Sequence, residues 1–402
     1  MIKKTFLIIA ALLIFSPTFC QWKVQYKTTL GKLNSVFFVD NNNGWAVGEN
    51  GVILYYNGTD WNLQNSNTTC FLNSVFFLDK NNGWAVGDSG TILKYDGIKW
   101  ETQISGTLDP LKSVFFTDIN NGWVAKYCCD LLKYNGKKWE TPNTGIFINL
   151  NSLYLFDSKS GWVSGNSGKL YKLIDTIWER KYLKTAYPYY DLYSLFFTDS
   201  SNGWAVGRDY RTLKGIILNY KNSDWQEDTI GLSSILYGVF FRNNNLGWAV
   251  GEKGAIYKLY WNKWEKQVII DNTAAIIMSI YFIDNKKGWA VNWMGEILYT
   301  DNGGDSTTSI NQKIDYSSLE LSNYPNPFTS QTTINYSLNK SGRILLNVYD
   351  NFGRKINTLK DEVQEPGEHR TTFYPLNLTP GIYYYTLQTE YNSQSRRMVL
   401  IK

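Results

Sequence analysis

The chain has 402 residues, of which 16% are aromatic, with 16 Trp and 29 Tyr. This length accommodates two or three domains, and the aromatic content suits the faces of β-sheets and excludes a mostly disordered chain. The 40 basic residues nearly balance the 35 acidic ones. Since no basic stripe or polybasic segment stands out, neither nucleic acid nor an anionic membrane surface is expected as a partner.

The first twenty residues have the order of a signal peptide. Two lysines precede an apolar run from Phe6 to Phe15, and small residues follow it. The run is shorter than the roughly 18 apolar residues of a membrane-spanning helix, which disfavours a transmembrane anchor. The sequence therefore predicts a signal peptide over residues 1–20, cut before Gln21. A lipoprotein cut at Cys20 stays an alternative.

A Gly-Trp pair recurs along the next part of the chain. It begins at Gly44, Gly83, Gly122, Gly161, Gly203, Gly247 and Gly288. A period of about 40 residues is typical of a four-stranded propeller blade. The sequence therefore predicts an all-β fold whose main part, residues 21–301, is a seven-bladed β-propeller.

The second copy gives the plan of a blade. The apolar run Leu72–Leu78 suits a buried inner strand, Gly83–Gly87 a second strand, Thr91–Tyr95 a third and Trp100–Gln103 an outer one. An Asp or Asn precedes each Gly-Trp pair by four residues. Such side chains bond the backbone two residues on and fix turns. A calcium loop is the alternative, but the alternating ligands and closing Glu of such a loop are missing.

The Trp of the outer strand predicts how the ring closes. Six copies carry it, at Trp61, Trp100, Trp139, Trp178, Trp225 and Trp264, whereas the seventh copy has none. Trp22 precedes Gly44 by the same number of residues as Trp61 precedes Gly83. We therefore expect Gln21–Gln25 to be the outer strand of the seventh blade, so that the N-terminal strand closes the ring and removes two open sheet edges.

The form Gly-Trp-Ala-Val-Gly-x-x-Gly-x-Ile-Leu, followed by Gly-x-x-Trp, resembles the repeat of the photosystem II assembly and stability factors. It is also similar to the sialidase-type BNR repeat. Both resemblances imply a propeller. The sialidase reaction would need an arginine triad, a nucleophilic Tyr and acidic partners, but the propeller arginines, Arg180, Arg208, Arg211 and Arg242, all belong to blades four to six. No Asp-box is intact, because segments such as Asp96–Trp100 keep only its Gly-x-x-Trp.

Other chemistry has few candidate residues. The single histidine, His369, lies beyond the repeats, which disfavours Ser-His-Asp, Cys-His and His-ligated metal sites. Cys128 and Cys129 stand at a hairpin; a metal or redox site is one interpretation and a divergent turn the other. Cys70 leaves an odd count and no disulfide framework. We expect no catalytic residue, no metal and no cofactor, so the prediction leans away from an enzyme.

Two insertions interrupt the repeat at the junction of blades four and five. The first falls near Tyr182–Tyr190, between the blades, and the second is a loop between Gly207 and Gly215, which separates the second and third strands of blade five. Both open on the same face, because the loop between second and third strands and the loop between blades lie at the same sheet ends. Tyr and Arg, the residue types of binding hot spots, are frequent in them. The predicted ligand-binding residues are Tyr187, Tyr189, Tyr190, Arg208, Asp209, Tyr210 and Arg211. Simple loop growth without function is the alternative.

Residues 302–320 are polar and form a predicted linker, and the strands of residues 321–402 predict a small immunoglobulin-like β-sandwich. The motifs of this segment lie in order at its start, middle and end: Tyr324, Pro325, Asn326, Pro327 and Phe328, then Gly353, then Gly381, then Arg396 and Arg397. Together they resemble the type A sorting domain of the type IX secretion system. An ordinary accessory sandwich is the alternative.

The sorting-domain resemblance implies partners in the type IX secretion and sorting machinery and passage across the outer membrane of a Gram-negative bacterium. It also implies removal of the domain, with attachment to surface lipopolysaccharide or release. The sequence thus predicts a secreted or cell-surface propeller that acts as a binding or adhesion module for a glycan or a protein. A carbohydrate-active propeller enzyme is the alternative. An assembly factor inside the envelope is a third hypothesis, which the sorting signal disfavours.

Overall fold

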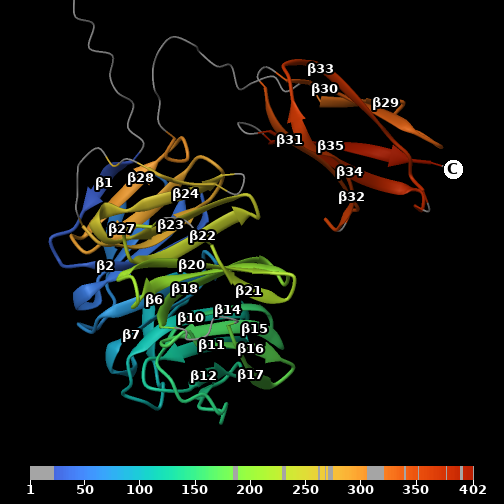
Figure 1. Cartoon of the computed structure of the whole chain (residues 1–402). Helices are drawn as coiled ribbons and strands as arrows, with labels where there is room; N and C mark the ends of the chain where they lie inside the picture. Colours follow the sequence, from blue (N-terminus) through green and yellow to red (C-terminus); the bar gives the residue numbers. More distant parts are fainter. Residues whose placement is uncertain are drawn as a thin grey trace, which may run out of the picture. The chain divides into compact units, whose positions relative to one another are not determined.

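The computed structural model divides into two compact units, residues 1–308 and 309–402 (Figure 1). It describes residues 22–183, 189–228, 232–260, 263–267, 269, 275–305, 321–338, 341–351, 353–376, 378–389 and 393–401. The predicted signal peptide and most of the predicted linker lie outside these residues. Strands dominate both units, and the described residues include three 3-10 turns, η1 (Glu49–Gly51), η2 (Asp88–Gly90) and η3 (Glu252–Gly254).

The first unit consists of seven four-stranded antiparallel sheets, as predicted. The innermost strands are β2 (Leu33–Asp40), β6 (Leu72–Asp79), β10 (Leu111–Asp118), β14 (Leu150–Asp157), β18 (Tyr190–Asp199), β22 (Leu236–Asn243) and β26 (Ile277–Phe282). The second strands, which carry the Gly-Trp pairs, are β3 (Asn43–Gly48), β7 (Asn82–Gly87), β11 (Asn121–Lys126), β15 (Ser160–Gly165), β19 (Asn202–Asp209), β23 (Leu246–Gly251) and β27 (Gly288–Asn292).

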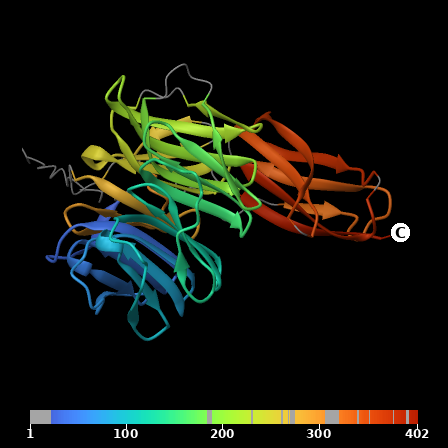
Figure 2. The same cartoon turned by 90° about the horizontal axis from the view of Figure 1, so that it is seen from below.

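Two further strands complete each sheet. The third strands are β4 (Ile53–Tyr56), β8 (Ile92–Tyr95), β12 (Leu131–Tyr134), β16 (Leu170–Ile174), β20 (Lys214–Lys221), β24 (Ile256–Tyr260) and β28 (Glu296–Thr300). The outer strands are β5 (Trp61–Gln64), β9 (Trp100–Gln103), β13 (Trp139–Glu140), β17 (Ile177–Lys181), β21 (Asp224–Glu227), β25 (Lys263–Lys266) and β1 (Lys23–Lys27). Each innermost strand contacts the next, and β26 contacts β2, so the sheets form a closed ring (Figure 2).

In six of the seven blades the glycine of the Gly-Trp pair makes room for a phenylalanine ring on the neighbouring strand, and in blade four Gly161 lies against Leu155 instead. Gly83 pairs with Phe77 across β6 and β7, and a Cβ atom on Gly83 would lie only 2.2 Å from the Phe77 ring. The tryptophan then reaches the next blade: Trp45 stacks on Phe77 with ring centroids 3.6 Å apart. The last such stack, Trp289 on Phe38 at 3.9 Å, joins blade seven to blade one.

The N-terminal strand closes the seventh blade, which confirms the prediction. β1 pairs with β28 at the outside of the sheet, two residues later in the chain than the predicted segment. The Trp22 ring meets Phe282 edge to face, with centroids 5.7 Å apart and planes at 88°. Within blade two, Trp100 meets Phe77 in the same way, at 5.7 Å and 87°. Trp22 therefore occupies the outer-Trp position of blade seven.

A hydrogen bond from five of the seven outer tryptophans links neighbouring blades. Trp61 Nε1 donates to Gln25 Oε1 at 3.0 Å, and Trp22 Nε1 donates to Gln267 Oε1 at 3.0 Å. The acceptor stands three residues after the outer Trp of the preceding blade. Blades three and four carry Pro142 and Lys181 at that place. As a result, the buried Nε1 atoms of the two following tryptophans, Trp178 and Trp225, have no partner among the described residues.

Replacing Lys181 by Gln is expected to raise the free energy of unfolding by about 1 kcal/mol, because it gives Trp225 Nε1 an acceptor. The exposed ion pair of Lys181 with Glu179 contributes little. Denaturant unfolding of the purified protein measures the change. Lys138→Gln is the matched control: it breaks a similar exposed pair with Glu140 without facing a tryptophan. Equal effects of the two substitutions would contradict this account.

The Asp or Asn that stands four residues before each Gly-Trp pair stabilises a turn, as predicted. Asp79 Oδ1 accepts a hydrogen bond from the Asn81 backbone N–H at 2.7 Å, and Asn82 Nδ2 donates to the same carboxylate. The same bond to the N–H two residues on occurs in all seven copies. In blade three these bonds hold the pKa of Asp118 below its usual value.

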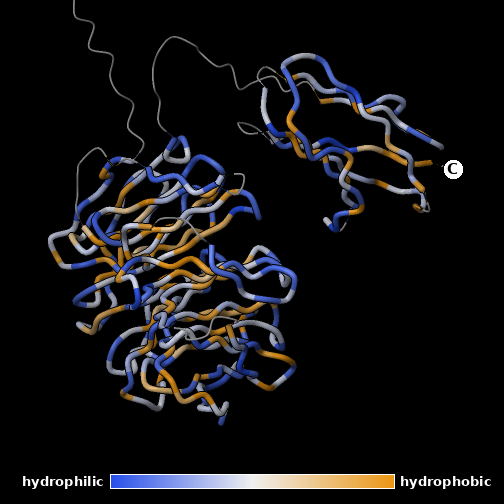
Figure 3. The backbone as a smooth tube through the Cα atoms, in the orientation of Figure 1, coloured by the Kyte–Doolittle hydropathy of each residue, from blue (hydrophilic) through white to orange (hydrophobic). Residues whose placement is uncertain are grey.

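The second unit is a sandwich of two antiparallel sheets. One contains β29 (Leu321–Tyr324), β30 (Thr332–Leu338) and β33 (Gly367–Phe373), and the other β32 (Lys355–Gln364), β31 (Gly342–Tyr349), β34 (Gly381–Thr389) and β35 (Ser393–Leu400). Its core joins residues of both sheets, such as Ile334 and Leu346, and contains only residues of this unit. In both units hydrophobic segments follow the strands (Figure 3).

Candidate functional site

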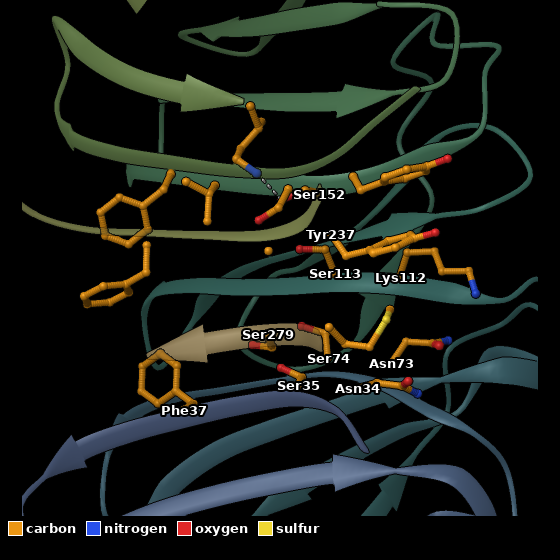
Figure 4. Close-up of a pocket in the computed structure, with 18 of the residues that line it drawn as sticks. Asn34, Ser35, Phe37, Asn73, Ser74, Lys112, Ser113, Ser152, Tyr237 and Ser279 are labelled. Atoms are coloured by element: carbon orange, nitrogen blue, oxygen red, sulfur yellow. Dashed lines mark hydrogen bonds between the residues drawn. The ribbon is translucent and has the colours of Figure 1, made fainter. Parts of the chain in front are cut away.

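The innermost strands of all seven blades line a central cavity of about 410 Å³. Three positions on each of these strands form three layers, which in blade one are those of Asn34, Ser35 and Phe37. Figure 4 shows these three residues following one another along the channel. The volume falls within the roughly 300–1,000 Å³ of small-molecule sites. The channel is therefore the first candidate for a binding site.

The middle layer consists mainly of serines, whose hydroxyl groups link neighbouring blades by hydrogen bonds. The Ser35 hydroxyl accepts the backbone N–H of Val75 at 3.2 Å, and Ser152 accepts that of Leu195 at 3.0 Å. Equivalent bonds to Ser74, Ser113 and Ser279 continue the layer. The N–H groups are available because the ladder shifts register beside each serine. Blade six has Gly238 at this position.

An aromatic layer surrounds one end of the channel. It consists of Phe37, Phe76, Phe115, Tyr154, Phe196, Phe240 and Tyr281, one side chain from each blade. Each ring contacts the next, with centroids 4.7 to 5.5 Å apart, and Tyr281 contacts Phe37 at 4.9 Å. Burial raises the pKa of Tyr154 and of Tyr281 to about 12, so both hydroxyls stay protonated at neutral pH.

The other end of the channel is polar, and we call it the mouth. Its layer consists of Asn34, Asn73, Lys112, Asn151, Tyr193, Tyr237 and Met278. These residues stand near the beginnings of the innermost strands. In a four-stranded antiparallel sheet, this is also the end at which the second strand turns into the third. The mouth and the two insertions therefore open on one face, which we call the insertion face.

The second insertion extends a hairpin. The sequence predicted a loop between Gly207 and Gly215, but β19 and β20 continue pairing to Asp209 and Lys214. The hairpin is held by Arg211, whose Nε donates to Asp209 Oδ1 at 3.0 Å and whose Nη2 donates to the Tyr190 hydroxyl at 2.5 Å. Burial acts to raise the pKa of Asp209, but the hydrogen bonds and charge of Arg211 outweigh it and lower that pKa.

Not all predicted ligand-binding residues can contact a ligand directly. Tyr190 is completely buried, its hydroxyl donates to Glu227 and accepts from Arg211, and Asp209 is buried as well. These two side chains hold the hairpin, so a role in direct contact was the wrong interpretation for them. Tyr189 is exposed on the insertion face. Tyr187 lies outside the described residues.

Tyr210 and Arg208 stand beside the mouth. The Tyr210 hydroxyl donates to Asp191 Oδ2 at 2.7 Å, and this bond raises the pKa of Tyr210. The Arg208 guanidinium lies over the Tyr210 ring, 4.6 Å from its centroid. The Arg208 Nε atom is buried without a hydrogen-bond partner among the described residues. The residue as a whole is only half-buried.

Two tyrosines of the mouth continue this cluster. Tyr193 and Tyr237 stack with ring centroids 5.1 Å apart and planes 20° apart, and both line the channel. Neither these two tyrosines nor the three mouth asparagines were among the predicted ligand-binding residues. Their position in the repeat could have identified them, because each stands directly before the serine or glycine of the middle layer. We call Tyr193, Arg208, Tyr210 and Tyr237 the rim cluster.

Exposed hydrophobic side chains also gather on the insertion face. Trp293 and Met294 follow β27, while Leu108 and Phe147 lie in the connections between blades, and the Phe147 side chain is 79% exposed. Large exposed apolar groups near a concave site are typical of interaction surfaces. They therefore support the choice of this face.

Other chemical candidates are less well placed. Cys70, Cys128 and Cys129 are free thiols, and hydrogen bonds from Thr91 and Thr68 lower the pKa of Cys70. Within the described ranges, no group of three His, Cys, Asp or Glu side chains gathers as a metal site would need. Burial raises the pKa of Glu227, and its partner Tyr190 is too deeply buried for this tyrosine–carboxylate pair to meet a substrate.

The sorting motifs of the second unit come together although they are distant in sequence. Asn326 Oδ1 accepts the Val399 backbone N–H at 2.9 Å, and Asn326 Nδ2 donates to the Arg397 carbonyl at 3.0 Å. Phe328 is buried and exchanges backbone hydrogen bonds with Val399 and Ile401. Arg396 and Arg397 lie on the same last strand, Gly353 takes a left-handed φ of 78° in a turn, and Gly381 begins β34.

Known proteins resemble each of the two units. Residues 322–402 match the family described as "Secretion system C-terminal sorting domain". No curated protein is similar enough to count as a relative. One similar solved structure is YCF48 bound to D1 peptide, 18% identical, with a TM-score of 0.58 over 70% of this chain and 94% of that one. YCF48 from Cyanidioschyzon merolae is 16% identical, with a TM-score of 0.57 over 69% and 98%.

PorZ, a surface component of the type-IX secretion system of Porphyromonas gingivalis, is 13% identical, with a TM-score of 0.52 over 90% of this chain and 58% of that one. At these identities the structural likenesses show the fold alone. No helix in the described part of the chain is long and apolar enough to span a membrane. The sorting domain implies export to the cell surface or secretion by the type IX system. The chain therefore combines a β-propeller with a C-terminal sorting domain of the type IX secretion system.

Proposed function

We propose that this protein is an exported binding module, and that its ligand enters the propeller at the mouth of the central channel. The observation that carries the proposal is the rim cluster, in which three tyrosines and an arginine with a buried, unpartnered Nε stand together at one side of the opening, on blades five and six. Tyr and Arg dominate binding hot spots elsewhere. The sorting domain supports the place of action, outside the cell.

The regular blades supply a rigid frame for this site. The stacked Gly-Trp rings and the serine layer hold the innermost strands in fixed positions, so the mouth needs little ordering when a ligand binds, which favours affinity. Catalysis is not part of the proposal, which assigns the mouth a binding role alone. The polar mouth and the exposed apolar side chains around it support binding of a ligand that covers part of the insertion face.

Replacing Arg208 by Ala is expected to weaken binding about tenfold or more, as hot-spot truncations do. The probes are arrays of glycans and of peptides, read with the fluorescently labelled mature protein. Arg180→Ala is the matched control, because Arg180 lies over the Tyr182 ring at 4.5 Å but stands on an outer strand. If both variants bind every array ligand as the wild type does, the mouth is not the binding site.

A further inference from the structure

The three asparagines of the mouth hold their amides in one orientation. Asn34 Nδ2 donates to the carbonyl oxygen of Leu72 at 3.0 Å, Asn73 Nδ2 to Leu111 at 2.9 Å, and Asn151 Nδ2 to Leu192 at 3.0 Å. Each acceptor is a backbone carbonyl of the next blade, so the amide nitrogen must face it. The Oδ1 atoms accept no hydrogen bond from any residue that the structure describes. Three acceptor oxygens thus remain available around the cavity.

The same cavity also offers donors and aromatic surface. Five serines of the middle layer use their oxygen to accept a backbone N–H, namely Ser35, Ser74, Ser113, Ser152 and Ser279, so their hydroxyl protons can turn towards a ligand. Tyr193 and Tyr237 present aromatic rings in the lining. Alternating donors and acceptors around a polar opening, next to aromatic rings, match a ligand that carries several hydroxyl groups on an apolar ring frame.

The charges at the mouth select among ligands with many donors. No carboxylate side chain lines the cavity among the described residues, and at its rim Arg208 stands across the strand pair from Asp191, so the charges at the opening are balanced and favour neither an anion nor an ammonium ligand. The Lys112 charge is itself compensated, because its Nζ lies 3.6 Å from Asp88 Oδ1 and over the Tyr127 ring. The rest of the channel lining consists of neutral groups, and a neutral ligand fits it.

We propose that the mouth takes a terminal sugar residue of a neutral saccharide. Its hydroxyls donate to the oxygens of Asn34, Asn73 and Asn151 and accept from the serine hydroxyls, while its ring lies against Tyr193 or Tyr237. This assignment rests on the proposed binding function and names its ligand class. A cavity of about 410 Å³ accommodates the end of a chain rather than its length, so recognition concerns the terminus.

The test compares two variants with the wild-type mature protein. Titration calorimetry uses the neutral oligosaccharides of glucose, galactose, mannose and N-acetylglucosamine that bind on the array. The double variant Asn34→Ala/Asn151→Ala is expected to weaken binding about tenfold, since each lost hydrogen bond accounts for roughly twofold to tenfold. Lys112→Asn gives blade three the residue of its neighbours and adds an amide, so neutral saccharides are expected to bind as tightly or more tightly.

Lys112→Asn also separates this assignment from its alternatives, and the inter-blade contact that it removes, the partly exposed 3.6 Å ion pair with Asp88, contributes little to stability. Uronate-containing oligosaccharides and short peptides serve as comparison probes. If only these bind, with a loss on Arg208→Ala, the saccharide assignment is wrong while the binding function stands. A tenfold loss of neutral saccharide binding in Lys112→Asn would also overturn the assignment. If no probe binds in a manner that depends on Arg208, both the ligand class and the proposed function fail.

Discussion

Replacing Trp22 by Ala is expected to lower the free energy of unfolding by about 3–5 kcal/mol, the usual effect of truncating a buried Trp. The side chain is completely buried, meets Phe282 edge to face and donates to Gln267. Its loss removes these interactions at the place where the N-terminal strand β1 joins the seventh blade. Denaturant unfolding of the mature protein, followed by tryptophan fluorescence and by circular dichroism, measures the change.

Two controls identify the origin of the effect. Lys23→Ala changes an exposed side chain of the same strand and should leave stability within about 0.5 kcal/mol of the wild type. Trp100→Ala removes an outer Trp of the same geometry inside the ring and should cost about as much as Trp22→Ala. If Trp22→Ala unfolds at the wild-type denaturant concentration, the N-terminal strand does not hold the ring closed.

The repeat allowed the architecture to be predicted because each repeated residue has a packing reason. Gly83 must lack a side chain beneath the Phe77 ring, and Trp45 must reach the next blade. Such requirements recur in every blade and therefore appear in the sequence as a period. The position of Trp22 followed from the same rule, although β1 begins and ends two residues later than predicted. Pairing continues to Lys27, whose Nζ lies 2.8 Å from Glu296 Oε1.

The site was predicted only in part, since its residues depend on how the chain is folded locally. Irregular spacing indicated the junction of blades four and five, where the rim cluster of the proposed site lies. It could not distinguish the buried Tyr190 from the half-exposed Tyr210, because that difference arises from the extension of β19 and β20 into a hairpin. The residues of the mouth belong to the regular part of the repeat, so no irregularity in spacing marks them.

Trp178 and Trp225, whose buried Nε1 atoms have no acceptor among the described residues, are a second feature that the sequence did not predict. Pro142 and Lys181 look like ordinary variation in sequence, yet they remove the acceptor for a tryptophan of the next blade. The contact joins residues about 36–45 positions apart, and its partner is evident only when the blades lie side by side. Sequence periodicity therefore predicts the frame well, whereas inter-blade hydrogen bonds require the structure.

Removing the sorting domain is expected to abolish export while leaving the propeller folded. The core of the second unit contains only residues of that unit, and Asn326 and Phe328 hold the motif at its start against the last strand. A chain that ends before Leu321 therefore loses the complete sorting domain and none of the propeller core. Its thermal unfolding transition should match that of the propeller in the full chain, which serves as the control for folding.

The most direct measurement is the location of the propeller in a Gram-negative host with a type IX secretion system. An antibody against the propeller, applied to intact cells, medium and periplasmic extract, follows the full chain and the truncated chain. The account predicts that the full-length product appears on the surface or in the medium, and that the truncated chain stays in the periplasm. Equal amounts of the two proteins outside the cell would contradict the central claim that the sorting domain delivers this propeller to its place of action.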